Sequence, residues 1–156
     1  MIKYLAVFFI SMIPILELRF AVPFAVGMDL PYIPALITCV IGNMIPVPFI
    51  YLFARKFLLW GARQKIIGTF CQKVLEKGEK AGRKIVSTTG RGGTFVALML
   101  FVGIPVPGTG AWTGTLGASF LKMGIRSTTL AVSIGVVLAG IIMTVLSSLG
   151  LHLFGF

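Results

Sequence analysis

The stretch at residues 92–121 reads GGTFVALMLFVGIPVPGTGAWTGTLGASFL and carries no charged residue. Two apolar arms flank a centre, residues 103–110, that is rich in glycine and proline. This centre interrupts a helix, because proline removes a backbone donor and glycine weakens helical structure. An arm of about ten residues rises only ~15 Å, half of a ~30 Å hydrocarbon core. The stretch therefore predicts a re-entrant hairpin, which enters and leaves a membrane on the same face.

The beginning of the chain has the same organisation. Residues 4–16 and 20–28 are apolar, and the charged triplet Glu17-Leu18-Arg19 lies between them. Neither piece is long enough to cross a membrane alone. The dipeptide Ile13-Pro14 also precedes Ile104-Pro105 by 91 residues. We therefore predict a first re-entrant hairpin over residues 1–31 and a second over residues 92–122.

Each hairpin is followed by an apolar segment long enough to span a membrane, at residues 32–56 and 125–150. The chain is 57% hydrophobic and 12% charged, about half of the roughly 25% charge of soluble domains. Because a hairpin does not cross the membrane, one crossing per half brings the second hairpin in from the opposite face. The sequence thus predicts an all-α integral membrane fold, built as an inverted repeat of re-entrant hairpin plus transmembrane helix. Pro46 and Pro48 predict a kink in the first span.

Residues 57–91 form a basic linker between the two halves. Ten of the fourteen basic residues lie between Arg55 and Arg91, which places this segment on the cytoplasmic side and both termini outside. Apolar residues at helical spacing predict an amphipathic helix that ends at residues 90–93. One face of this helix carries Lys73, Lys77, Lys80 and Lys84. The helix either lies on anionic lipid headgroups or is a solvated connection, and Arg91 either binds a headgroup phosphate or anchors the membrane edge.

Glu17 and Arg19 are the strongest functional candidates, because an ionisable group at membrane depth costs at least ~2.5–3.5 kcal/mol. The two side chains either neutralise each other and fix the hairpin tip, or act on a substrate. Arg19 suits an anionic ligand, since its planar guanidinium donates two parallel hydrogen bonds. A desolvated Glu17 holds a proton more readily and could exchange one during transport.

The remaining polar candidates each allow two interpretations. Asp29 either lines the outer vestibule or caps the first span. Asn43 either binds a cation or substrate, or joins two helices. The centre of the second hairpin leaves backbone groups free to bind an anion, while its glycines also allow close helix packing. The candidates in this centre are Pro107, Gly108, Thr109 and Gly110.

Other classes of function are disfavoured by the pattern of residues. The basic charge is confined to one loop between apolar segments, which indicates contact with lipid headgroups and not with nucleic acid. Cys39 and Cys71 lack neighbours at metal-ligand spacing, so we expect no metal site and no disulfide. No Ser-His-Asp set or phosphate-binding loop is found, and we expect neither an enzyme nor a cofactor.

Two motifs resemble the signature segments of the small multidrug export family. They are Glu17-Leu18-Arg19 leading to Pro23, and the run GIPVPGTGAWTG at residues 103–114. That family is similar to the DedA superfamily, which includes the VTT-domain scramblases. The resemblance covers nearly the whole chain and implies two re-entrant hairpins, two spans, a homodimer and proton- or sodium-linked transport, including that of polyprenyl-phosphate lipid carriers.

The resemblance also bears on the site. DedA proteins place two acids in the first hairpin, similar in spacing to Glu17 and Asp29. They place two arginines in the second hairpin, where this sequence has Ile104 and Gly110. Arg19 would then substitute for that basic pair from the opposite hairpin.

We therefore expect a multi-pass transporter of a prokaryotic inner membrane that translocates an anionic lipid carrier. The first alternative is export of small cationic or amphipathic compounds, with Glu17 as the partner of the cation. The second is a membrane scaffold without transport, which recruits partners or lipids through its basic helix.

Overall fold

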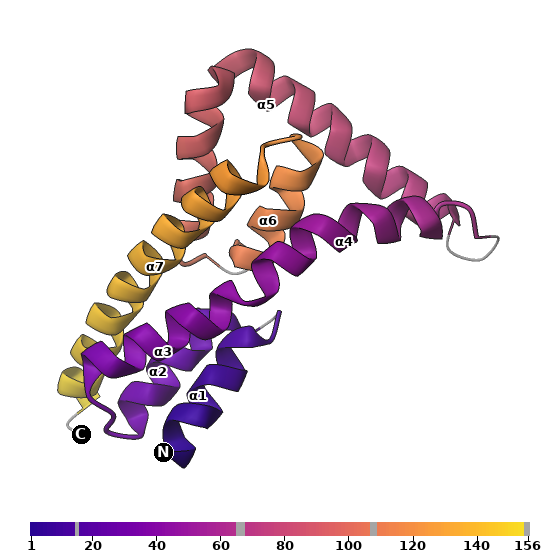
Figure 1. Cartoon of the computed structure of the whole chain (residues 1–156). Coiled ribbons are helices and arrows are strands. Elements are labelled where there is room, and N and C mark those ends of the chain that lie inside the picture. Colours follow the sequence, from indigo (N-terminus) through magenta and orange to yellow (C-terminus); the bar gives the residue numbers. More distant parts are fainter. Residues whose placement is uncertain (15, 65–67, 107–108, 155–156) are drawn as a thin grey trace.

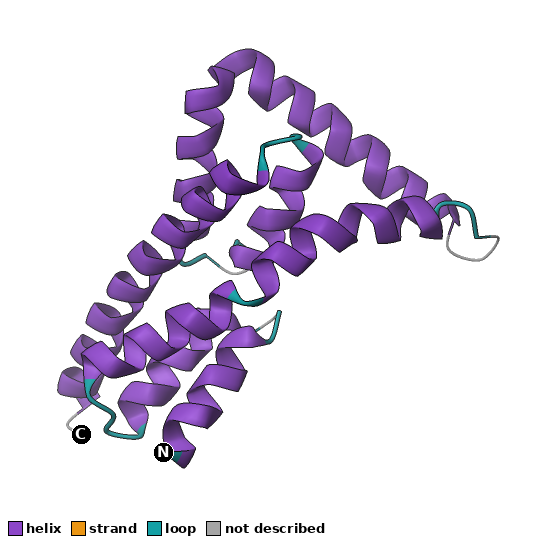
Figure 2. Cartoon of the chain, in the orientation of Figure 1, coloured by secondary structure: helices purple, strands orange, loops and turns teal. Residues whose placement is uncertain are grey.

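A computed structural model describes residues 1–14, 16–64, 68–106 and 109–154. Within these residues the chain forms helices joined by short turns, and no strand (Figure 2). The helices are α1 (Ile2–Met12), α2 (Glu17–Gly27), α3 (Tyr32–Met44), α4 (Pro46–Gly61), α5 (Gly68–Gly103), α6 (Ala111–Phe120) and α7 (Ile125–Phe154). Tyr32–Phe53 and Ile125–Gly150 are long and apolar enough to cross a membrane. The prediction of an all-helical chain with two such segments is confirmed.

Two interruptions fall where the sequence places them. The first span is interrupted at Ile45, immediately before Pro46, where a kink is predicted, so that α3 and α4 follow one another. The predicted end of the linker helix at residues 90–93 is confirmed, because the backbone at Gly90 is not helical and a second helical segment begins after this kink. There Gly90 has φ 66° and ψ −177°, and the helix continues on its other side to Gly103. Glycine adopts this positive φ at little cost, which explains why the bend falls at this residue.

Two helical hairpins face each other along the molecule (Figure 1). Hairpin 1 consists of α1 and α2, and hairpin 2 consists of α6 and the last part of α5, residues 92–103. The open end of hairpin 1 lies beside both chain termini, whereas hairpin 2 opens at the opposite end. Their turns meet in the middle of the molecule. Helix α7 runs past this meeting point, whereas α3 reaches the middle of the molecule and α4 continues from there.

Helix α2 in the first half and helix α6 in the second half end with the same turn. Leu30 donates its backbone N–H to Ala25 at 3.1 Å, and Met123 donates to Ala118 at 3.2 Å. Each residue of the second pair lies 93 positions after its counterpart. The residue before each donor, Asp29 or Lys122, has a positive φ, 55° and 52° respectively. This is the hydrogen-bonding pattern of a Schellman turn, formed twice.

A glycine contact also occurs in both halves. A Cβ atom at Gly42 on α3 would lie 2.6 Å from the carbonyl oxygen of Phe8 on α1. A Cβ atom at Gly135 on α7 would lie 2.7 Å from the carbonyl oxygen of Met99 on α5. The glycines are 93 residues apart and the carbonyls 91. In the first half the glycine lets α3 approach the backbone of α1. In the second half it lets α7 approach the backbone of the last part of α5.

We expect Gly42→Ala and Gly135→Ala each to destabilise the protein by about 1–3 kcal/mol, because the added methyl group overlaps backbone that cannot move independently. Thermal unfolding in detergent measures the effect. Gly150→Ala is the matched control, since no atom lies within 4 Å of its added Cβ. Equal unfolding temperatures for all three variants would contradict this packing.

Candidate functional site

The contact between the two hairpin turns, which we call the tip junction, brings charged side chains against broken helix ends. Glu17 and Arg19 lie in the first turn of α2. Glu17 is only 6% exposed, and Arg19 is half-buried. Both side chains make their hydrogen bonds to hairpin 2, which lies more than eighty residues further along the chain. The tip junction therefore joins the two halves of the protein through polar groups.

Glu17 binds the beginning of α6. The backbone N–H of Trp112 donates to Glu17 Oε1 at 3.2 Å. A Cβ atom at Gly110 would overlap the carboxylate, so the glycine provides the space that Glu17 occupies. The first N–H groups of a helix have no partner within the helix and carry a partial positive charge. Glu17 therefore fills the anion-binding position of α6 with a carboxylate from the other half of the chain.

Arg19 binds the opposite kind of helix end. Its guanidinium donates to the carbonyl oxygens of Val106 and of Ile104, the latter at 3.4 Å, and to Thr109 Oγ1 at 2.7 Å. Thr109 Oγ1 also lies 2.9 Å from both of these carbonyl oxygens. The carbonyls follow the end of α5, where the helix dipole is negative. The sequence left two roles open for Arg19, fixing the hairpin tip with Glu17 or contacting an anionic ligand, and here its guanidinium contacts hairpin 2.

The backbone of Glu17 is itself unusual. Its φ is 49°, in the left-handed region that residues other than glycine rarely adopt. Such a conformation costs on the order of 1–3 kcal/mol and persists only where the surroundings maintain it. The contact with α6 is one such restraint. A loss of this contact would therefore also release strain in the backbone.

The other predicted site residues are distributed as follows. Gly110 and Thr109 join Glu17 and Arg19 at the tip junction, whereas Pro107 and Gly108 lie outside the described residues. Asp29 is exposed and terminates α2, and α3 begins after Pro31 with no side-chain cap.

Asn43 is buried on α3, and its Oδ1 atom has no hydrogen-bond partner among the described residues. Of the predicted headgroup ligands, Lys73 is exposed on α5. Lys77, Lys80, Lys84 and Arg91 also lie in α5, but their side chains are outside the described set.

An apolar cavity of ≈ 560 Å³, widely open to the surroundings, adjoins the tip junction. Pro14 and Trp112 border it at the tip junction, and the aromatic rings of Phe49, Phe53 and Phe57 line it along α4. The Trp112 indole N–H has no acceptor among the described residues. The cavity thus offers an aromatic wall next to a buried carboxylate.

Sequence reasoning missed these lining residues. For Trp112 it left open a stacking wall, an anchor or packing between helices, and it did not single out the phenylalanines. Their spacing of four residues, which places them on one face of a helix, was the available signal.

A family model described as "Putative small multi-drug export protein" matches residues 17–142. This segment begins at Glu17 and includes the tip junction and most of α7. No curated protein and no solved structure matches the chain.

Replacement of Arg19 by methionine should destabilise the tip junction, because it removes the hydrogen bonds of the guanidinium to Ile104, Val106 and Thr109. A hydrogen bond that involves a charged group contributes about 1.5–3 kcal/mol. The unfolding temperature in detergent should therefore fall, and Arg19→Lys should recover only part of the loss since lysine lacks the planar fork. Arg63→Met, at an exposed position, is the control. The assignment fails if Arg19→Met is as stable as Arg63→Met.

Proposed function

Because the chain belongs to the small multi-drug export protein family, we propose that it is a membrane transporter, and not an enzyme, whose transport site is the tip junction. The observation that carries this proposal is the buried carboxylate of Glu17, bound by a helix terminus of the opposite hairpin and adjacent to an apolar cavity. An ionisable group buried at the centre of a membrane protein is a functional group by default. The contact of Glu17 with the beginning of α6 rests on one titratable side chain, so it can open when that side chain is protonated.

We propose that hairpins 1 and 2 are re-entrant and form an inverted repeat. The matching turns at Leu30 and Met123 and the matching glycines at Gly42 and Gly135 support this arrangement. Broken helices that meet between repeats are a common plan of secondary transporters. The basic segment then lies on the cytoplasmic side of a prokaryotic inner membrane, with both termini outside. Because one chain offers only two spanning segments, we expect a homodimer.

Glu17 would act as the exchangeable acid of this transporter. An ionised carboxylate accepts hydrogen bonds from the amino end of α6 more strongly than a protonated one does. Protonation therefore weakens the hydrogen bond between Glu17 and the N–H of Trp112, and the strained φ of Glu17 favours release. Arg19 would remain on hairpin 2 and keep the two turns in register while the contact at α6 opens.

We propose cationic amphipathic compounds as the substrate class, exported in exchange for a proton on Glu17. The rings of Phe49, Phe53, Phe57 and Trp112 can bind the apolar body of such a compound and attract its positive charge. Glu17 supplies the counter-charge once the compound reaches the tip junction. The donors of Arg19 are occupied by hairpin 2, which reduces its suitability for a substrate anion.

A second candidate, translocation of an anionic lipid carrier such as a polyprenyl phosphate, is favoured by one observation. The amino end of α6 already binds an anion, the carboxylate of Glu17. A phosphate could replace that carboxylate when Glu17 is protonated, which would couple one proton to one lipid. This candidate also agrees with the resemblance to the DedA superfamily.

Transport by purified protein in liposomes tests both candidates. A fluorescent lipophilic cation and a labelled polyprenyl phosphate are followed separately, with and without a pH gradient. We expect gradient-driven movement of the cation, reduced to the level of empty liposomes by Glu17→Gln. Glu76→Gln, which makes the same change at an exposed position on α5, should leave transport intact.

The other outcomes distinguish the alternatives. Movement of the polyprenyl phosphate alone, lost in Glu17→Gln, would replace the first candidate by the second. Absence of transport of either probe by folded protein would contradict both. In cells, a phenotype that survives Glu17→Gln but disappears when Lys73, Lys77, Lys80 and Lys84 are neutralised would indicate a scaffold.

A further inference from the structure

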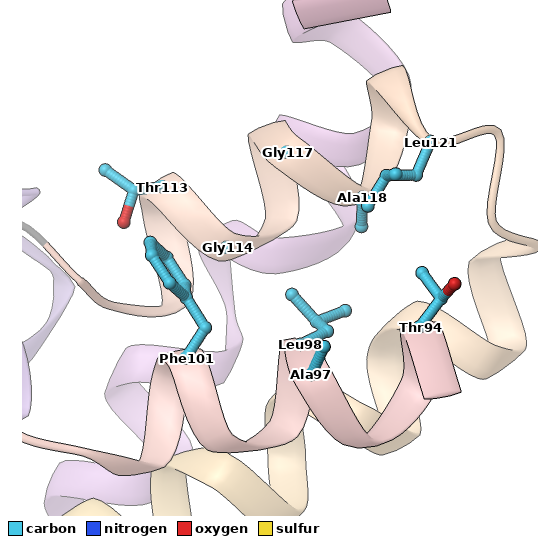
Figure 3. Close-up of a pocket in the computed structure, with 9 residues that line it drawn as sticks. All are labelled: Thr94, Ala97, Leu98, Phe101, Thr113, Gly114, Gly117, Ala118 and Leu121. Carbon is cyan, nitrogen blue, oxygen red and sulfur yellow. The ribbon is translucent and has the colours of Figure 1, made fainter. Parts of the chain in front are cut away.

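A second groove lies on hairpin 2, between α6 and the last part of α5 (Figure 3). It has a volume of ≈ 240 Å³ and an apolar lining. Thr113 and Phe101 lie at one end, near the tip junction, and Leu121 and Thr94 lie at the other. Along α6 the groove extends over about eight residues, or ~12 Å. It is therefore a narrow apolar slot that runs along the hairpin.

The slot exists because of a glycine that packing between the helices does not require. Gly114 is needed for packing, since a Cβ atom there would lie 2.6 Å from Val102. Gly117 differs, because no atom lies within 4 Å of the position of its Cβ. The residue 93 positions earlier, on α2, is the large side chain Phe24. The second half of the chain thus leaves open a volume that a side chain of ordinary size could fill.

The charges around the slot indicate what occupies it. Lys122 directly follows Leu121 at one end, Arg126 lies in the first turn of α7, and both are exposed. Residues 92–156 contain no acidic residue. A second copy of the chain placed symmetrically on this face would bring these cations close to their own counterparts, which is unfavourable. An anionic headgroup over an apolar chain matches both the charged end and the apolar slot.

We propose that this groove is a specific binding site for an acyl chain of an anionic phospholipid, with the headgroup held by Lys122 and Arg126. The chain lies between α5 and α6 and reaches toward Thr113. The acyl chain of the bound lipid fills the volume that Gly117 leaves open. It lies along hairpin 2 with its end toward the tip junction. This site differs from the basic face of the linker helix and does not depend on transport.

Native mass spectrometry of the full-length protein, released from mixed phosphatidylglycerol and phosphatidylcholine micelles, tests the site. We expect one retained phosphatidylglycerol per chain, at several times the occupancy of phosphatidylcholine. Gly117→Phe should abolish this retention by filling the slot, and Ala97→Phe, which fills it from the wall formed by α5, should do the same. Gly150→Phe adds the same bulk at an open position outside the groove and should retain the lipid.

A second pair of changes separates the headgroup from the chain. The double variant Lys122→Gln with Arg126→Gln should still retain one lipid but lose the preference for phosphatidylglycerol. Unchanged retention in both Gly117→Phe and Ala97→Phe, with unfolding temperatures showing that both are folded, would overturn the proposal. Conversion of a dimer to a monomer by Gly117→Phe, without loss of lipid, would also overturn it and would assign the groove to a second copy of the chain.

Discussion

Two helix ends inside the molecule require partners that water supplies in a soluble protein. The end of α5 presents carbonyl oxygens, and the beginning of α6 presents N–H groups. In hydrocarbon each such group without a partner costs several kcal/mol. Hairpin 1 contacts both ends from a single helical turn: Arg19 donates to the carbonyls of Ile104 and Val106, which also accept local N–H groups, and Glu17 accepts from Trp112. The position of hairpin 2 relative to hairpin 1 depends on this pair of contacts.

The charges at the tip junction are complementary to dipoles and not only to each other. A cation lies at the negative end of one helix, and an anion lies at the positive end of the next. The order of the two residues in the sequence determines which helix end each one reaches. An exchange of Glu17 and Arg19 would keep the net charge, but it would set each residue against the helix end that repels it. This makes the order, and not only the composition, of the triplet necessary to the fold.

The sequence predicted the helices and the interruption of hairpin 2, because proline, glycine and the lengths of apolar runs act locally. It also located the functional candidates, since charges within apolar segments are rare. The partners of these charges were beyond sequence reasoning. Nothing local shows that Arg19 reaches Val106 or that Glu17 fits against Gly110, because these contacts join positions far apart in the chain. The four-residue spacing of the phenylalanines on α4 can be seen in the sequence. It indicates a binding surface only once the structure shows that they border the same cavity as Trp112.

The two halves share turns and glycine contacts, yet they contribute unequally to the tip junction. Hairpin 1 supplies both charged side chains, and the position 93 residues after Arg19 is Trp112. A transporter made of two equivalent halves can pass between two states of equal energy when the halves exchange conformations. For a protein that works as proposed here, that exchange cannot re-form the same ionic contacts. Its two end states must differ in free energy, so the protein has a preferred resting state, and a proton or a substrate must supply the energy to leave it.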